Sequence, residues 1–237
     1  MESYMNRISN TGIVPVVKIL EKEDAYPLAK ALLNGGIDVI EVTYRSEHAT
    51  SAIQTISKEL PDMLVGAGTV LSVEQAKEAV QAGAKFIITP GFNTKVVQWC
   101  LNHDVEVYPG VSTASEVEMA LSMGLTQLKF FPAESSGGAK KLKDLSAPYA
   151  NVHFMPTGGI NTKNMHDYLS LPNVEAIGGS FMLPNDLVVA KDWNGIEALS
   201  RAAIKSLLDF QLIHVGINTN SPEESKQVTD TLCSLFH

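Results

Sequence analysis

The chain has 237 residues, 45% of them hydrophobic, which is enough for one large domain with a full core. Its 18 basic and 26 acidic residues give a net charge of −8 with no prominent basic run, which excludes nucleic acid and anionic membranes as expected partners. Two distant cysteines without a C-x-x-C motif, residues 1–7 without an apolar leader, and no apolar stretch near about 18 residues predict a reduced cytoplasmic protein.

Short runs rich in β-branched and other apolar residues recur along the chain and predict eight β-strands. Amphipathic segments with helical periodicity lie between these runs. In chain order, the expected strands cover residues 13–18, 39–43, 63–67, 86–89, 105–109, 127–131, 152–156 and 176–178.

Capping signals mark the ends of three of the expected helices. The first runs from residue 25 to 33 and ends at Asn34-Gly35-Gly36, a glycine stop signal. The second follows Ser72, which can cap it, with Gln75 completing a capping box. The third follows Thr113, with Glu116 in the same arrangement.

Strict alternation of strands and helices over about 200 residues predicts an α/β fold, with a parallel sheet and helices outside it. Eight such units favour a closed (β/α)8 TIM barrel over an open doubly wound sheet, and no nucleotide fingerprint follows the first strand. We expect this barrel to cover residues 1–208. Active-site residues should then lie at the C-terminal ends of the strands.

Two charged residues lie inside apolar strands, Lys129 in 127–131 and Glu41 in 39–43. Period-2 alternation places Lys129 and Phe131 on the face opposite Leu128 and Phe130, and we expect this face to point into the barrel. The same rule points Glu41 inward, so the two charges should meet. A buried lysine that loses its proton can form a Schiff base with a ketone. The alternatives are a lysine that reaches solvent or an inert ion pair.

Two glycine-rich turns come late in the chain, at the ends of the last two expected strands. The first contains Thr157, Gly158 and Gly159, and the second contains Gly179 and Ser180. Barrels of this kind often bind phosphate with these two loops, because glycines let backbone N–H groups approach an anion. We therefore expect a phosphate site there, although turns use glycine for other reasons too.

Two further residues follow strands at the same end. Arg45 offers a planar fork suited to a carboxylate, and Thr69 ends the third strand with a hydroxyl. The six histidines show no metal-ligand spacing, and no G-x-S-x-G elbow occurs. The sequence therefore favours a metal-free aldolase over a metal-dependent aldolase or a serine hydrolase.

The chain resembles the bacterial 2-keto-3-deoxy-6-phosphogluconate (KDPG) aldolases, which also act as 4-hydroxy-2-oxoglutarate (KHG) aldolases. The resemblance spans residues 13–208 in the family order. The motifs that carry it are Ile40-Glu41-Val42-Thr43-Tyr44-Arg45, Gly66-Ala67-Gly68-Thr69-Val70, Thr89-Pro90-Gly91, Leu128-Lys129-Phe130-Phe131-Pro132-Ala133-Glu134, Pro156-Thr157-Gly158-Gly159-Ile160 and Gly178-Gly179-Ser180.

The resemblance implies a homotrimer of (β/α)8 barrels that acts on a 2-keto acid sugar phosphate with no metal or cofactor. It implies Lys129 as the Schiff-base lysine and Glu41 as the general acid/base. It also implies Arg45 and Thr69 as carboxylate ligands and the two glycine turns as the phosphate site. Pro90 and Phe131 lie in matching motifs and are included among the substrate-binding residues.

The expected reaction is retro-aldol cleavage of KDPG to pyruvate and glyceraldehyde 3-phosphate, with KHG as a second substrate. The sequence does not rank these two substrates. Alternatives are a galactonate-phosphate aldolase, against which Arg45 argues, another phosphate-binding barrel enzyme, or a sensor that retains the pocket.

The tail, residues 209–237, is not expected of a minimal aldolase. Residues 210–218 predict a strand, and Ser221, Pro222 and Glu224 give capping signals for a short helix. A lone strand and helix are not stable unattached, so we expect an appendage that packs on the barrel or on a neighbouring subunit.

Overall fold

The computed structural model describes residues 4–208 and 221–235. Its strands are β1 Ile13–Val17, β2 Val39–Thr43, β3 Leu64–Gly68, β4 Phe86–Ile88, β5 Glu106–Tyr108, β6 Gly110–Val111, β7 Gln127–Phe130, β8 His153–Pro156 and β9 Ile177–Gly179. Its helices are α1 Tyr4–Thr11, η1 Lys22–Asp24, α2 Ala25–Asn34, α3 Ala49–Glu59, α4 Val73–Ala82, α5 Thr94–Asn102, α6 Ala114–Ser122, η2 Glu134–Ser136, α7 Gly138–Ser146, α8 Met165–Leu169, α9 Asn185–Val189, α10 Trp193–Leu208 and α11 Pro222–Leu235.

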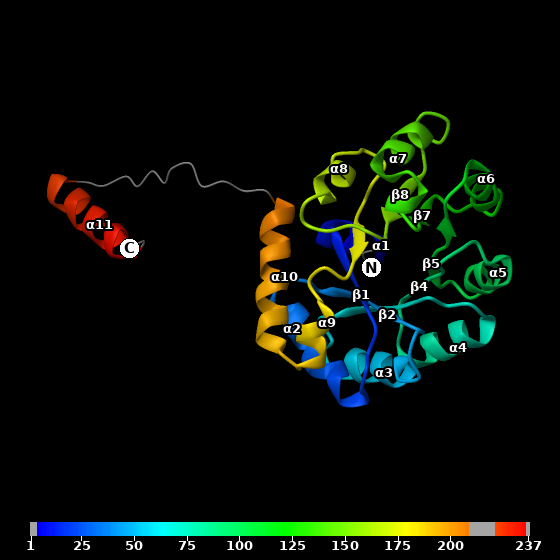
Figure 1. Ribbon diagram of the computed structural model, residues 1–237, viewed down its shortest axis with the longest axis horizontal. Coiled ribbons are helices and arrows are strands. Elements are labelled where there is room, and N and C mark those ends of the chain that lie inside the picture. Colours follow the sequence, from blue (N-terminus) through cyan, green and yellow to red (C-terminus); the bar gives the residue numbers. More distant parts are fainter. Residues whose placement is uncertain (1–3, 209–220, 236–237) are drawn as a thin grey trace.

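All strand pairs are parallel, and the strands form a curled sheet with helices around its outside (Figure 1). Six strands follow the order β5-β4-β3-β2-β1-β9, and three follow the order β6-β7-β8. A parallel bridge between Thr157 and Gly178 links the ends of β8 and β9. Pro109, which has no N–H to donate, separates β5 from β6. The predicted parallel α/β architecture is confirmed, and each expected strand lies within one residue of its observed bounds.

The alternation of side chains along the strands separates two apolar clusters. One faces the interior of the curled sheet and includes Val14, Val39, Phe86 and Met155. The larger cluster fills the space between the strands and the surrounding helices. Residues next to each other in a strand therefore belong to different environments.

The predicted caps are largely confirmed. Ser72 Oγ accepts a hydrogen bond of 3.2 Å from the N–H of Gln75, while the Gln75 side chain accepts from Leu71 rather than from Ser72. Thr113 and Glu116 form the complete reciprocal box at the start of α6.

Helix α11 begins as expected, with Ser221 Oγ accepting a hydrogen bond of 3.2 Å from the N–H of Glu224. The strand expected at 210–218 lies outside the described residues. None of the helices within 4–208 and 221–235 is long and apolar enough to cross a bilayer.

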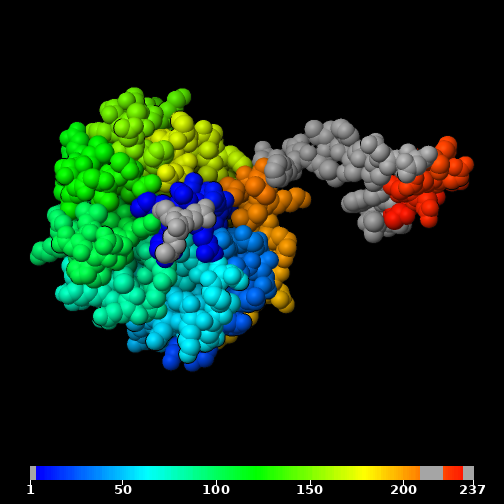
Figure 2. Space-filling model, turned by 180° about the vertical axis from the view of Figure 1, so that it is seen from behind, coloured from blue at the N-terminus to red at the C-terminus, as the bar shows by residue number. Residues whose placement is uncertain are grey.

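Helix α1, which was not predicted, covers the end of the sheet where the strands begin. Ile8 is buried in the interior cluster, and Tyr4 and Met5 pack against it. From behind Figure 1, α1 lies near the middle of the visible face, in dark blue (Figure 2). The interior of the curled sheet is therefore closed at this end by apolar side chains.

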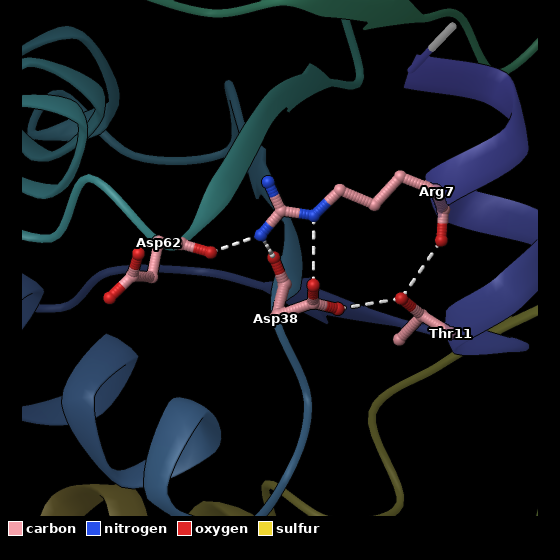
Figure 3. Close-up of polar contacts among 4 residues, drawn as sticks. All are labelled: Arg7, Thr11, Asp38 and Asp62. Carbon is pink, nitrogen blue, oxygen red and sulfur yellow. Dashed lines mark hydrogen bonds and ion pairs between the residues drawn. The ribbon is translucent and has the colours of Figure 1, made fainter. Parts of the chain in front are cut away.

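Arg7 fixes α1 to the loops that lead into β2 and β3 (Figure 3). Its Nε donates to Asp38 Oδ2 at 2.8 Å, and its Nη2 donates to the Asp38 carbonyl at 3.2 Å and to the Asp62 carbonyl. Thr11 Oγ1 donates to the other Asp38 carboxylate oxygen at 2.6 Å. A single guanidinium therefore joins three chain segments.

Candidate active site

Two charged side chains are buried together inside the curled sheet. Lys129 of β7 is 4% exposed and Glu41 of β2 is fully buried. The Lys129 ammonium donates a hydrogen bond of 3.2 Å to Glu41 Oε1. Burying either charge alone would be costly, so each stabilises the other in place. The predicted meeting of these two residues is confirmed.

An aromatic ring and an unpaired carboxylate oxygen lie beside the buried pair. Lys129 Nζ lies 5.3 Å from the centre of the Phe131 ring, a distance at which the ring face stabilises a cation. Glu41 Oε2 is buried and has no hydrogen-bond partner among the described residues. One carboxylate oxygen therefore contacts the amine, while the other has an unused hydrogen-bond acceptor capacity.

A glycine of β3 creates the space that the Glu41 carboxylate occupies. A Cβ at Gly68 would overlap Glu41 Oε1, so any larger residue would displace the carboxylate from Lys129. The sequence analysis did not single out Gly68 as a functional residue. The available signal is a glycine inside a strand, which often marks a close approach of another group.

Arg45 is oriented by a residue that the sequence analysis also missed. Its Nε donates to Thr43 Oγ1 at 3.1 Å, and Thr43 Oγ1 donates to the carbonyl of Val17 at 2.7 Å. Thr43 is buried at the end of β2, so it joins the Arg45 side chain to the last residue of β1. The guanidinium is thereby held at the C-terminal ends of two neighbouring strands.

Thr69 and Pro90 lie at the same end of the sheet. Thr69 follows β3 directly with φ of +54°, a left-handed conformation that is uncommon for a residue other than glycine and that recurs at functional sites. The Pro90 backbone lies against Gly110, where a Cβ would overlap it, and Gly110 is the strand partner of Lys129. Both predicted residues therefore lie on segments next to the buried pair.

The two glycine turns are neighbours, as expected. The bridge between Thr157 and Gly178 places them side by side, and a Cβ at Gly178 would overlap Thr157 Oγ1. Gly158 and Gly159 have φ values of +104° and +82°, which side chains rarely adopt. Thr157 Oγ1 is buried and has no hydrogen-bond partner among the residues described. The glycines therefore leave the turn backbone without side chains that would keep a ligand away from it. The Thr157 hydroxyl beside them has no partner among the described residues.

Comparison with known proteins identifies the family. Residues 4–199 match the family model described as KDPG and KHG aldolase. A 2-dehydro-3-deoxy-phosphogluconate aldolase of Treponema pallidum is 45% identical over 205 residues, which cover 86% of this chain and 98% of that protein. The KHG/KDPG aldolase of Escherichia coli K12 is 44% identical over 199 residues, which cover 84% of this chain and 93% of that protein. The chain belongs to the KDPG and KHG aldolase family.

A solved relative connects this family to covalent chemistry. The KDPG aldolase of Legionella pneumophila, solved with pyruvate captured as a covalent carbinolamine, is 40% identical with a TM-score of 0.82. The alignment covers 85% of this chain and 98% of that one.

One acidic residue of the aldolase lies against the first glycine turn. The N–H of Glu134 donates to the carbonyl of Gly158 at 3.1 Å, and its carboxylate accepts a hydrogen bond from the Tyr168 hydroxyl. Burial and this carboxylate raise the pKa of Tyr168 well above its usual value, so the hydroxyl remains a donor. A Cβ at Gly159 would lie 2.6 Å from Glu134 Cγ. The first glycine turn is therefore flanked by the Glu134 side chain.

Proposed function

We propose that this chain is a Schiff-base aldolase that cleaves KDPG to pyruvate and glyceraldehyde 3-phosphate. The observation that carries the proposal is the buried contact between Lys129 and Glu41 at the C-terminal half of the sheet. Family membership and the carbinolamine captured in the Legionella pneumophila relative support it.

The first half of the reaction forms the covalent intermediate. Glu41 takes a proton from the Lys129 ammonium across their hydrogen bond, and the neutral amine attacks the C2 ketone of the substrate. The carbinolamine then loses its hydroxyl as water, with Glu41 returning the proton, and an iminium ion remains. Its positive charge lies beside the Phe131 ring that faces the ammonium in the free protein.

The second half breaks the carbon–carbon bond. The iminium accepts the electron pair of the C3–C4 bond as the C4 hydroxyl loses its proton to Glu41 or to a water that Glu41 holds. Glyceraldehyde 3-phosphate leaves, and the enamine takes a proton at C3. Water then adds to the iminium, and the collapse of the carbinolamine releases pyruvate and the free lysine.

The remaining predicted residues bind the two ends of the substrate. Arg45 and Thr69 hold the carboxylate, with Pro90 beside them. The turns containing Thr157 and Ser180 hold the phosphate through backbone N–H groups and hydroxyls. Binding energy from these remote groups positions the C3–C4 bond against Lys129 and so contributes to turnover.

KHG is proposed as a second substrate, cleaved to pyruvate and glyoxylate. Its pyruvate half needs the same Lys129, Glu41 and Arg45 side chains, and only the phosphate contacts are not used. The dual name of the Escherichia coli relative supports this proposal.

The finer architecture is part of the same proposal. We infer that the two sheets form one closed (β/α)8 barrel over residues 1–208, supported by the bridge at Gly178 and the near-continuity of β5 and β6. A cytoplasmic homotrimer and a separate appendage over residues 209–237 remain predictions. Size measurement by light scattering would check the trimer.

Reductive trapping tests the central claim. The protein is incubated with pyruvate and borohydride, which converts an iminium to a permanent secondary amine, and the labelled peptide is identified by mass spectrometry. We expect a single adduct at Lys129 and none in Lys129→Arg. An adduct at Lys18 or Lys163 with Lys129 unlabelled would overturn the assignment, and no adduct at any lysine would overturn Schiff-base chemistry.

A further inference from the structure

A lysine directly after β1 has no role in the site described so far. Along β1 and the two residues after it, Val14 belongs to the interior cluster, whereas Ile13, Val17 and Ile19 belong to the cluster between strands and helices. Alternation therefore puts Lys18 on the interior-facing set, at the C-terminal end of the strand. It is an exposed residue at the same end of the sheet as Arg45.

Lys18 and Arg45 line one cavity. This cavity, of about 200 Å³, also includes Ser180 in its wall, and apolar residues such as Val16 and Leu183 form much of the rest. It is smaller than the roughly 300–1,000 Å³ of a typical small-molecule site. Lys18, Arg45 and Ser180 of the second glycine turn therefore line the same small space.

Neither cation forms an ion pair with another described residue. Lys191, by contrast, contacts Asp24 at 2.7 Å. Glu47 borders an adjacent hollow with Lys18 and Arg45, but its carboxylate is 89% exposed, and its ion-pair contact is with His48 at 4.0 Å. Two like charges that line one cavity repel each other, and bound anionic groups relieve this repulsion. The arrangement therefore fits an anionic ligand.

The position of β1 indicates which anion. In the sheet, β1 lies between β9, which leads to Ser180, and β2, which leads to Arg45. The register pairs Pro15 with Gly179, so Lys18 extends beyond the level of the second glycine turn. The five residues assigned to phosphate are all uncharged, and Glu134 flanks their first turn. A phosphate monoester carries about −1.5 to −2 charges at pH 7, and because Arg45 is assigned to the substrate carboxylate, Lys18 is the cation of this cavity that is left for the phosphate.

We propose that Lys18 binds the phosphate group of the substrate and thereby favours phosphorylated 2-keto acids over KHG. Lysine suits this role because its ammonium is a compact charge on a flexible stem, and phosphate accepts hydrogen bonds from several directions. The inference rests on the proposed function for its substrate, but not for the binding of phosphate itself.

Steady-state kinetics of Lys18→Met test the proposal. We expect the KM for KDPG to rise about tenfold, the effect of one charge-assisted hydrogen bond at a solvent-exposed rim, and the KM for KHG to stay within about twofold. Lys18→Arg should restore most of the affinity. The matched control is Lys22→Met, an exposed lysine of the same loop that does not line the cavity. Equal losses toward both substrates would assign Lys18 to the carboxylate, and unchanged kinetics would make it a solvated lysine; either result overturns the proposal.

Binding of inorganic phosphate separates this inference from the proposed function. Phosphate should raise the Tm of the wild-type protein and of Lys22→Met, and this shift should be largely lost in Lys18→Met. Pyruvate trapping at Lys129 should be the same in all three proteins. If wild type traps no pyruvate but shows the Lys18-dependent phosphate shift, the proposed reaction fails and the phosphate site stands. If Lys18→Met shifts as much as wild type, the Lys18 inference fails.

Discussion

The two ends of the curled sheet use charge in opposite ways. Where the strands begin, Arg7 has three acceptors, and Asp38 accepts from both Arg7 and Thr11. Where the strands end, Glu41 Oε2 and Thr157 Oγ1 are buried without partners among the described residues. A polar group that is left unsatisfied in the interior lowers stability, whereas a satisfied network adds to it.

A missing hydrogen bond alone does not mark the working end. The buried Tyr108 hydroxyl of the interior cluster also lacks a partner in the described structure, and burial raises its pKa far above the usual value. What distinguishes the C-terminal end is the combination of unpaired buried polar atoms with a buried ion pair and glycine turns. The contrast predicts that substitutions at one end change catalysis and at the other change stability.

The largest effect is expected from replacing the buried pair. Lys129→Met with Glu41→Gln should lower turnover by more than roughly 10³-fold, because nucleophile and proton carrier are both lost. The double variant should unfold at the same urea concentration as wild type or higher, since neutral groups replace two buried charges. Activity assays and urea denaturation check both statements. A large loss of stability would show that the pair supports the fold, and the contrast between the ends would break down.

The next largest effect is expected at Gly68. Gly68→Ala should lower kcat by about 10²-fold, as the added methyl group displaces the Glu41 carboxylate from Lys129. Glu41→Asp shortens the side chain by one methylene, so Glu41→Asp combined with Gly68→Ala should be more active than the product of the single effects predicts. Gly91→Ala, where a Cβ has no atom within 4 Å, is the control for the glycine substitution itself. Additive losses would mean that Gly68 does not act through Glu41.

At the other end, Arg7→Met should cost stability without a loss of turnover. We expect the lost hydrogen bonds to lower the free energy of unfolding by about 1–2 kcal/mol. The ion pair should add little because both side chains are partly exposed. Urea denaturation measures this loss. Thr11→Val should cost less, and the two changes should not add because both act on Asp38. A fall in kcat at unchanged stability would contradict the assignment of this end to folding.

The smallest effect concerns a polar group at the C-terminal end with a purely structural role. Burial alone would raise the pKa of Glu116, but hydrogen bonds from Ser112 and Thr113 lower it overall. Because the folded pKa is lowered, the stabilising effect of Glu116 is present above its ordinary pKa and is lost as pH falls through the folded value. Thr113→Ala should lower the free energy of unfolding by about 1 kcal/mol near neutral pH and by less in acid. It should leave kcat unchanged. Urea denaturation at several pH values checks the trend, and a pH-independent difference would contradict it.

The sequence could predict the strands and the inward pair because both depend on local periodicity. The runs around Lys129 and Glu41 alternate with period 2, and an apolar interior leaves two inward charges only each other as partners. The predicted glycine turns also lie side by side, since loops after neighbouring strands must be neighbours.

Other features depend on contacts that periodicity does not show. Helix α1 contains only one fully buried residue, Ile8, and Arg7 fixes it to a residue 31 positions away. The roles of Gly68 and Thr43 arise from side chains that meet across neighbouring strands. No local pattern in the sequence encodes such distances.

The closed end covered by α1 also determines how this protein can be attached to a solid support. Ser9 is exposed on α1, at the end away from the cavity that Lys18 and Arg45 line. A cysteine introduced at Ser9 of a Cys233→Ser variant and coupled to a maleimide resin would hold every molecule with its strand C-terminal ends toward the liquid phase, because the remaining thiol, Cys100, is buried. Substrate in a flow reactor would then reach Lys129 without crossing the support. The linker would be attached at the end of the sheet that lies opposite the candidate active site.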